Sequence, residues 1–265
     1  MGVFDPWNDA LPGPPWHSGT MTTAILCARA LSKRYGAGIA LHNVDLDIAA
    51  GESVAIMGAS GSGKTTLLHS LAGITLPDSG QVSYAGQDVT ALNETQRSKL
   101  RRESFGFVFQ QGLLIPELTA IENVALALML NGVTRKAAEQ RAAGWLAELG
   151  LAGLEQRRIG ELSGGQAQRV AIARAQVGGA DVVFADEPTG ALDSHTSAEV
   201  MTALLAATAG RGKTLVLVTH DPTVASRCGR TVHMHDGVLS STPPVRPGGS
   251  GFPVSNGTTY MADPR

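Results

Sequence analysis

The stretch from residue 58 to residue 66, GASGSGKTT, constrains the fold of this chain more than any other part of its sequence. It matches the pattern G-x-x-x-x-G-K-[ST], with Gly58, Gly63, Lys64 and Thr65 at the fixed positions. Glycines let the backbone wrap closely around an anion, and a helix that follows presents its positive N-terminal end to that anion. In such a loop the lysine reaches the β- and γ-phosphates of a nucleotide, and the threonine hydroxyl binds Mg²⁺. We therefore predict a phosphate-binding loop formed by Gly58, Ala59, Ser60, Gly61, Ser62, Gly63, Lys64, Thr65 and Thr66.

The segments on both sides of the loop support this interpretation. Residues 52–57 form a short apolar run typical of a strand, and residues 66–72 have the spacing of a helix. A chance run of glycine and serine is the alternative, and the full match between a strand and a helix makes it the weaker one. A dinucleotide-binding turn needs G-x-G-x-x-G, and the pair Gly61 and Gly63 would require glycine where the chain has Thr66. The dinucleotide interpretation is therefore rejected.

The composition of the chain limits its size class and its partners. Its 265 residues, 43% of them apolar, are enough for one large domain or two small ones. A net charge of -2 gives no basic bias, which argues against nucleic acid as a main partner. Cys27 and Cys228 are far apart and form no C-x-x-C pair, so a reducing cytoplasm is the simplest setting. The longest apolar helical stretch, residues 124–130, is far shorter than the roughly 20 residues that a membrane span needs.

Hydrophobic periodicity predicts strands that alternate with helices, and this order favours an α/β fold with a mostly parallel sheet. Residues 39–48 alternate between apolar and polar side chains, as a half-buried antiparallel strand does. Residues 111–158 are instead a loop followed by helices, and we interpret them as an insertion into the α/β domain.

The two ends of the chain differ in composition from the part between them. Residues 1–22 and 240–265 are rich in Pro and Gly, and we expect both tails to be disordered. Met21 stands just before the first periodic segment and is a candidate start of translation. Residues 23–239 are then expected to form the folded domain.

Two carboxylates, Asp186 and Glu187, follow an apolar run that ends at Ala185. Such a run is typical of a central parallel strand, so both side chains would lie at its carboxyl end. There Asp186 would hold Mg²⁺, directly or through water, and Glu187 would orient and deprotonate an attacking water. In isolation an Asp-Glu pair at a strand end is by default a solvated helix cap. The catalytic interpretation of this pair therefore depends on the presence of the phosphate-binding loop.

A second glycine-rich helix start follows Leu162. Ser163 is a good N-cap, and Gly164 and Gly165 again allow an anion to approach the backbone, with Gln166 completing the motif. A plain Ser-capped helix is the alternative. The chain therefore carries two candidate anion-binding helix ends.

Three single residues have both a functional and a structural interpretation. His220 follows the apolar strand 215–219, where a neutral imidazole can bond a γ-phosphate oxygen, although a lone His is more often structural. Gln110 ends another apolar strand at the border of the insertion, where its amide can contact Mg²⁺ or the attacking water. Through that contact, Gln110 can couple occupancy of the nucleotide site to the insertion. Tyr35 can stack on an adenine ring or pack at a sheet edge.

Taken in order, these motifs resemble those of the nucleotide-binding subunits of ATP-binding cassette (ABC) transporters, and the resemblance covers residues 24–239. The positions that carry it are the adenine platform Tyr35, the Walker A loop at 58–66, the switch Gln110, the signature residues Ser163, Gly164, Gly165 and Gln166, the Walker B residues Asp186 and Glu187, the loop residue Asp193, and the switch His220. None of the catalytic positions is degraded, which indicates an active ATPase.

The resemblance implies a fold and an assembly. The fold is a P-loop NTPase (RecA-like) ABC ATPase core with an antiparallel β subdomain and a helical subdomain inserted at about residues 111–175. Two subunits are implied to pair head to tail, so that residues 58–66 of one and residues 162–166 of the other clamp each ATP. ATP and Mg²⁺ are then the implied cofactors. The implied catalytic residues are Glu187, His220 and Gln110. The implied metal ligands are Thr65, Gln110 and Asp186, and Asp193 is implied to lie beside the nucleotide.

Local sequence narrows the implied subfamily. Residues 105–110, 116–124 and 186–193 are similar to those of lipoprotein-releasing and macrolide-export ATPases. That group is implied to act on a separate transmembrane permease, by export or by moving extracytoplasmic parts. We therefore expect a homodimer bound peripherally to the cytoplasmic face of the cell membrane, with its permease docking at residues 111–122.

Two alternatives stay open. The chain can be a soluble ABC ATPase that is not coupled to transport, for example of the iron–sulfur assembly type, although the local sequence fits that type less well. It can also regulate cell-wall hydrolases through a permease-like partner. Recovery of a polytopic membrane protein separates the first alternative from transport, and a vesicle transport assay separates the second.

Overall fold

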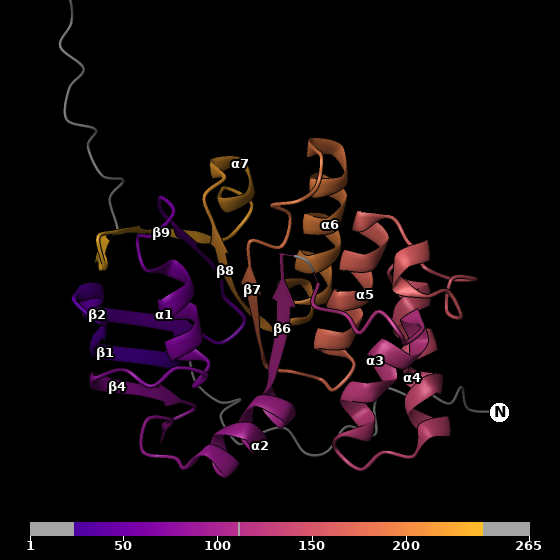
Figure 1. The fold of residues 1–265 in the computed structure, drawn as a ribbon, viewed down its shortest axis with the longest axis horizontal. Coiled ribbons are helices and arrows are strands. Elements are labelled where there is room, and N and C mark those ends of the chain that lie inside the picture. Colours follow the sequence, from indigo (N-terminus) through magenta and orange to yellow (C-terminus); the bar gives the residue numbers. More distant parts are fainter. Residues whose placement is uncertain (1–23, 111, 241–265) are drawn as a thin grey trace, which may run out of the picture.

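The computed structural model describes residues 24–110 and 112–240, which form two sheets with flanking helices (Figure 1). The predicted N-terminal tail, which includes Met21, lies outside the described residues. The predicted C-terminal tail also lies outside them, except for its first residue. Ser240, which the sequence assigns to the C-terminal tail, is the last residue of a strand. Among the described residues, no helix is both long enough and apolar enough to cross a membrane.

The larger sheet has six strands in the order β10-β9-β3-β8-β7-β6. All neighbours from β9 to β6 are parallel, and β10 returns antiparallel to β9. The mostly parallel sheet predicted from the sequence is therefore confirmed. Its strands are β3 (Ser53–Met57), β6 (Phe105–Phe109), β7 (Val182–Asp186), β8 (Thr214–Thr219), β9 (Arg230–His235) and β10 (Val238–Ser240).

Side chains of the parallel strands alternate between two hydrophobic cores, because successive residues of a strand point to opposite faces. In β7, Val182 and Phe184 belong to the core that contains α1 (Lys64–Leu71), whereas Val183 and Ala185 belong to the core that contains the helices between residues 120 and 225. None of the four is more than 1% exposed. Since β7 is covered on both faces, its sequence is a continuous apolar run rather than an alternation.

The smaller sheet is antiparallel, in the order β2-β1-β4-β5. Its strands are β1 (Ala24–Tyr35), β2 (Gly38–Ala49), β4 (Ser79–Tyr84) and β5 (Gln87–Asp88). The predicted alternation in β2 is confirmed, with Leu41, Val44, Leu46 and Ile48 all buried. The one break in that alternation, between Leu41 and Val44, coincides with a register shift against β1 and with Asn43 at φ 49°. The two-residue β5 is too short to give a periodic signal.

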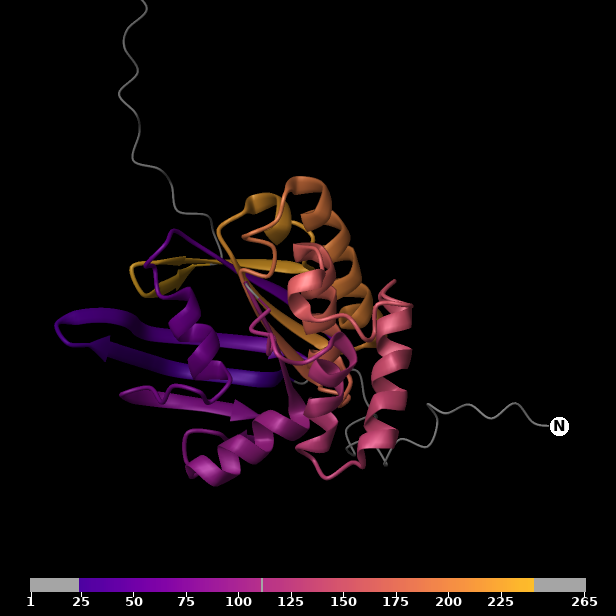
Figure 2. The ribbon, with the colours of Figure 1, turned by 45° about the vertical axis from the view of Figure 1, so that its right-hand side comes forward.

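The helices divide between the two sides of the parallel sheet. Figures 1 and 2 show β1, β2 and β4 on one side of the molecule and α3, α4 and α5 on the other. Trp145 is 6% exposed and shares one core with Val124 of α3 and Val183 of β7, so it is a core residue. The helices are α2 (Glu94–Ser104), α3 (Ala120–Met129), α4 (Arg135–Glu148), α5 (Gly164–Gln176), α6 (Ser194–Ala207) and α7 (Pro222–Ala225).

The shared core bears on the predicted helical subdomain. Residues of α3, α4 and α5 pack in the same cluster as Val183 and Leu217 of the parallel sheet. The helical segment at residues 111–175 therefore has no separate core of its own among the described residues. The assignment of these residues to an inserted helical subdomain stays a prediction.

Phe184 gives a test of this packing. Its ring is 1% exposed and lies 5.2 Å from the Phe105 ring and 5.6 Å from the Phe107 ring, centroid to centroid. Phe184→Ala should lower the free energy of unfolding by about 3–5 kcal/mol, because a large buried cavity forms. Urea denaturation measures the loss, with Phe109→Ala at the half-buried end of β6 as the matched control. An equal loss in the two variants would contradict the assignment of Phe184 to the centre of the core.

Candidate functional site

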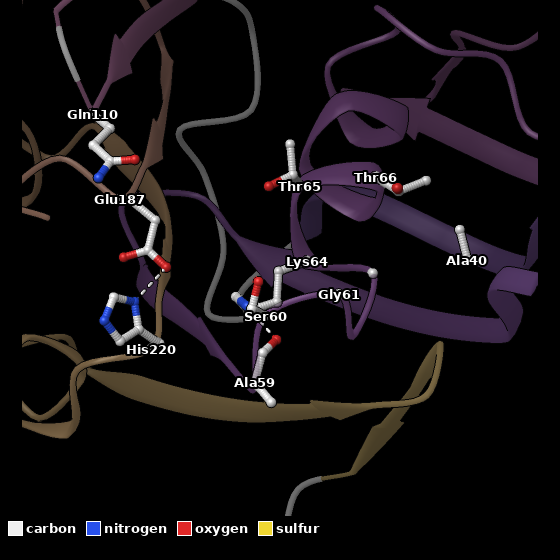
Figure 3. Close-up of a pocket in the computed structure, with 11 residues that line it drawn as sticks. Ala40, Ala59, Ser60, Gly61, Lys64, Thr65, Thr66, Gln110, Glu187 and His220 are labelled. Carbon is white, nitrogen blue, oxygen red and sulfur yellow. Dashed lines mark hydrogen bonds and ion pairs between the residues drawn. The ribbon is translucent and has the colours of Figure 1, made fainter. Parts of the chain in front are cut away.

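A cavity of about 630 Å³ lies at the carboxyl edge of the parallel sheet. Gly58, Gln110, Glu187 and His220 follow directly after β3, β6, β7 and β8, which are mutually parallel. Because parallel strands end at the same edge, residues far apart in the sequence meet there. The cavity is lined by Ala40, Ala59, Ser60, Gly61, Gly63, Lys64, Thr65, Thr66, Gln110, Glu187 and His220 (Figure 3).

The backbone of the phosphate-binding loop is packed too closely for side chains at two of its glycines. A Cβ at Gly58 would lie 2.2 Å from the carbonyl oxygen of Met234, and one at Gly63 would lie 2.2 Å from that of Ala40. Gly63 also has φ 104°, a conformation that other residues rarely adopt. Both fixed glycines of the motif are therefore needed to bring the loop against β2 and β9.

The loop leaves polar groups available to an anion. Gly63 is the N-cap of α1 and supplies no capping side chain, so the first N–H groups of this helix have no side-chain acceptor there. The buried Ser62 hydroxyl has no hydrogen-bond partner. Polar groups buried without partners are costly, and an anion seated on the loop would satisfy them. The residues present thus fit a bound phosphate group.

Lys64 lies beneath the same cavity. Its side chain leaves the residue only 7% exposed, and its Nζ donates to the Ala59 carbonyl oxygen at 2.7 Å. Within residues 24–110 and 112–240, Lys64 forms no ion pair with a carboxylate. Lys64 therefore places a positive charge at the wall of the cavity, held against the loop backbone at Ala59 (Figure 3).

The two carboxylates at the end of β7 have different surroundings. Asp186 accepts a hydrogen bond from the Thr65 hydroxyl at 3.3 Å, and burial raises the pKa of its carboxyl group. Glu187 lies on the cavity side, with its Oε1 2.9 Å from Nδ1 of His220 and its Oε2 3.5 Å from the Thr219 hydroxyl. Figure 3 shows Gln110 beside this Glu187–His220 pair.

Glu187 also has an unusual backbone conformation. Its φ is 46°, in the left-handed region, and its N–H donates to the Val218 carbonyl oxygen at 3.0 Å. A left-handed glutamate persists only where the surrounding structure fixes it, and such residues cluster at functional sites. The turn after β7 thus directs the Glu187 side chain toward His220 and away from the extended course of the strand.

The predicted signature residues lie apart from the cavity. Ser163, Gly164, Gly165 and Gln166 are absent from its lining, and α5 lies in the core on the opposite face of the parallel sheet from α1 (Figure 1). Ser163 accepts from the Gln166 N–H and forms a complete capping box. Within one chain, the structure shows only the plain Ser-capped helix start.

Asp193 and Tyr35 are also outside the cavity lining. Asp193 caps α6, and hydrogen bonds from the Thr196 hydroxyl and N–H hold the pKa of its carboxyl group below the usual range. Tyr35 is 56% exposed, and Nζ of Lys33 lies 5.7 Å from its ring centroid. The exposed Tyr35 ring leaves one face available for stacking, and its role stays a prediction.

Ala40 is the lining residue that sequence reasoning missed. It comes from β2, in the other sheet, and its carbonyl oxygen approaches Gly63. An alanine carries no chemical signal, so only the approach of the two sheets identifies it. Thr219 was likewise unremarkable in the sequence, although its hydroxyl contacts Glu187.

Asp186 provides a pH-dependent prediction. Because burial raises its pKa in the folded state, the ionised carboxyl group destabilises the folded state at neutral pH, and this penalty disappears as pH falls through the folded pKa. Asp186→Asn should therefore raise the Tm of the nucleotide-free protein at pH 7, because the amide carries no buried charge. Scanning calorimetry should show this gain shrinking at acidic pH.

Asp88 is the matched control for that experiment. The Thr90 hydroxyl holds the pKa of its carboxyl group below the usual range, so ionisation of Asp88 favours the folded state. Asp88→Asn should lower the Tm at pH 7, the opposite direction. A fall in Tm for both variants would contradict the assigned destabilising charge at Asp186.

Comparison with known proteins agrees with these observations. The family model described as ABC transporter matches residues 41–190. The macrolide export ATP-binding/permease protein MacB of Nitrosomonas europaea is 48% identical over 214 residues, covering 79% of this chain and 32% of MacB. The pyoverdine export ATP-binding/permease protein PvdT of Pseudomonas syringae pv. syringae is 46% identical over 226 residues, covering 83% and 34%. The chain thus spans about a third of the length of these curated relatives.

A solved structure matches over nearly its whole length. The ATP-binding cassette MJ0796, in a dimeric post-hydrolysis state bound to ADP and Pi, is similar with a TM-score of 0.74 and 39% identity. The match covers 81% of this chain and 96% of the cassette. The part of the chain that the structure describes therefore corresponds to one complete cassette.

Proposed function

Because the chain belongs to the ABC transporter family and is one of its ATP-hydrolysing cassettes, we propose that it binds Mg²⁺ and ATP in the 630 Å³ cavity and drives a separate membrane permease in an export system. One observation carries the site assignment. The phosphate-binding loop and the Glu187–His220 pair, distant in sequence, line a single cavity at the carboxyl edge of the sheet.

The phosphate groups would be held by residues 58–66. The N-terminal end of α1 borders the cavity and would present its first N–H groups to a phosphate, and Lys64 contributes the positive charge. Thr65 and Asp186 already contact each other at 3.3 Å, and Gln110 lines the same space. We assign these three residues to Mg²⁺, which when bound neutralises negative charge that develops on the phosphate oxygens.

Glu187 is the proposed general base. Its carboxylate faces the cavity and contacts His220 at 2.9 Å, so both groups can reach a water beside the terminal phosphate. Glu187 would accept the proton of that water, while His220 would orient the Glu187 carboxylate by donating to it from Nδ1. Hydrolysis needs positioning and charge stabilisation more than covalent catalysis, which suits a cavity lined by fixed polar groups.

The proposal assigns the signature residues to a second copy of the chain. Residues 163–166 lie outside the cavity of their own chain, and the similar cassette MJ0796 forms a dimer. In a head-to-tail homodimer, residues 163–166 and Asp193 of one copy would close the cavity of the other. Tyr35 would stack on the adenine ring from the open side.

A second cleft supports the permease part of the proposal. It measures about 340 Å³ and is lined by the cationic residues Arg101, Arg102 and Arg174 together with aromatic and aliphatic side chains. Leu113 and Leu130 on its rim are 61% and 63% exposed. The cleft includes Leu113 of the predicted docking loop, so we assign it to a permease segment that carries apolar side chains. The chain would then lie at the cytoplasmic face of the membrane.

The test is recovery of the permease from native membranes with the tagged chain. We expect a polytopic membrane protein to co-purify and to stimulate ATP hydrolysis after reconstitution in vesicles. Leu130→Glu places a charge on the rim of the second cleft and should reduce this recovery, whereas Val238→Glu on the exposed end strand β10 is the matched control. Full recovery with Leu130→Glu would refute the docking site. ATP hydrolysis with no membrane partner would refute the transport proposal and favour a soluble ATPase.

A further inference from the structure

Arg174 lies near the end of α5 with an unusual set of partners. Its guanidinium is half-buried, and this burial lowers its pKa below the ordinary value. Nη2 donates to the Gly112 carbonyl oxygen at 2.6 Å, and Nη1 donates to the Leu113 carbonyl oxygen at 2.8 Å. Across the described residues, no carboxylate forms an ion pair with it. The partly buried guanidinium of Arg174 therefore donates its hydrogen bonds to two consecutive backbone carbonyl groups.

The segment that Arg174 holds is a strained turn. Gly112 has φ 67° and Leu113 has φ 44°, both in the left-handed region. The Leu113 side chain is 61% exposed, so its own burial does not fix this conformation. The hydrogen bonds from Arg174 are therefore the main contacts that hold the two carbonyl groups in place.

A second side chain of α5 holds the other end of the same turn. Gln168, which is 3% exposed, donates from Nε2 to the Phe109 carbonyl oxygen at 2.9 Å. The Gly112 N–H donates to that same oxygen at 2.8 Å. One helix therefore bonds the backbone on both sides of Gln110. Gln168 bonds the carbonyl group that precedes Gln110, and Arg174 bonds two carbonyl groups that follow it.

The helix α5 is firmly packed in the core. Val170, Ala171, Ile172 and Ala173 of α5 are all fully buried, and its first turn carries Ser163 in a complete capping box. Gln110 itself lines the cavity beside Glu187. One buried helix thus carries both the signature residues at its start and the side chains that bond the backbone on the two sides of Gln110.

We propose that Arg174 is a positioning residue for Gln110 in the ATP site. Together with Gln168, it would fix the position of Gln110 through hydrogen bonds to the backbone carbonyl groups on both sides of that residue. This inference rests on the proposed function of the cavity. Arg174 is absent from the lining of the ATP cavity, so in the isolated chain its effect on ATP hydrolysis would pass through Gln110. Its planar fork suits two adjacent carbonyl groups, whereas a lysine at this position supplies one point charge.

The first arm of the test compares Arg174→Met and Arg174→Lys with the exposed control Arg141→Met on α4 in the full chain. For Arg174→Met we expect kcat for ATP hydrolysis to fall by about tenfold to a hundredfold, as small misplacements of catalytic groups do. The Kd for ATP, from titration calorimetry, should change by less than about twofold, because the phosphate loop is untouched. Arg174→Lys should recover part of the lost kcat, and Arg141→Met should behave as the unaltered chain.

The second arm repeats Arg174→Met in a Gln110→Ala background. If Arg174 acts through Gln110, adding Arg174→Met should cost less than about twofold in kcat there, since interacting residues are not additive. Equal fold losses in both backgrounds would overturn the proposal and leave Arg174 as a merely structural residue. A Kd for ATP that weakens as much as kcat would overturn it as well.

Two controls keep these outcomes distinct. Should Arg174→Met fail to fold, as thermal unfolding would reveal, Arg174→Lys carries the same two-background comparison. A chain without substitutions that binds but does not hydrolyse ATP would refute the proposed function of the cavity. Additive losses in an active chain would refute only the role of Arg174.

Discussion

Replacing Glu187 with glutamine should abolish ATP turnover and leave ATP binding intact. Glutamine keeps the shape of the side chain and its reach toward His220, 2.9 Å away, but it cannot accept a proton from water. Loss of a positioned general base lowers rates by about 10²–10⁴-fold. Phosphate release measures turnover, and calorimetric titration with ATP measures binding, with the Kd expected to stay close to that of the unaltered chain.

The exposed residue Glu103 is the matched control for this change. It lies on α2, where its carboxylate is 3.9 Å from Nζ of Lys99, and it is outside the cavity. Glu103→Gln makes the same chemical change and should leave both turnover and binding unaltered. Unchanged turnover in Glu187→Gln would remove Glu187 from the role of base.

Replacing Lys64 with alanine should instead remove nucleotide binding itself. The Lys64 ammonium is nearly buried, with the Ala59 carbonyl oxygen as its acceptor, so its charge is held toward the cavity before any ligand arrives. Truncating one member of a buried charge pair costs about 2–5 kcal/mol, which corresponds to a rise in Kd of at least about thirtyfold. Titration with ATP measures this rise directly.

The exposed Lys136 on α4 controls for loss of a positive charge in general. Lys136→Ala should bind ATP as the unaltered chain does. Lys64→Ala and Glu187→Gln together separate binding from chemistry, because the first should lose affinity and the second should lose only turnover. Tight ATP binding by Lys64→Ala would contradict the assignment of residues 58–66 to the phosphate groups.

The strands of the parallel sheet could be predicted because burial on both faces leaves continuous apolar runs. Phe184 and its neighbours in β7 are an example, and the same argument located the polar residues at the carboxyl edge. The candidate site was predictable for the same reason. Gln110, Glu187 and His220 each end or follow such a run, and parallel strands bring their ends together.

Other features had no local signal in the sequence. Ala40 reaches the cavity only because the antiparallel sheet packs against the phosphate-binding loop. The acceptors of Arg174 are backbone carbonyl groups, which every residue has, so no pattern of side chains marks them. The short helix α7 and the two-residue β5 are below the length at which periodicity can be read.

The signature residues show where one chain is not enough. The sequence predicts that Ser163 and its neighbours bind the nucleotide, yet in a single chain they cap α5 on the opposite face of the sheet from α1. The prediction and the structure agree only if a second copy supplies these residues. The central claim is therefore that the ATP site is shared between two copies of the chain.

Sedimentation velocity of the Glu187→Gln variant tests that claim most directly. Without ATP this variant should sediment as a monomer, and with ATP and Mg²⁺ it should sediment as a dimer, because the nucleotide is bound but not hydrolysed. Adding Ser163→Arg, which places a bulky cation at the predicted closing surface, should prevent the dimer while ATP still binds. A monomer in the presence of saturating ATP, or a dimer that Ser163→Arg does not disturb, would contradict a site shared between two copies.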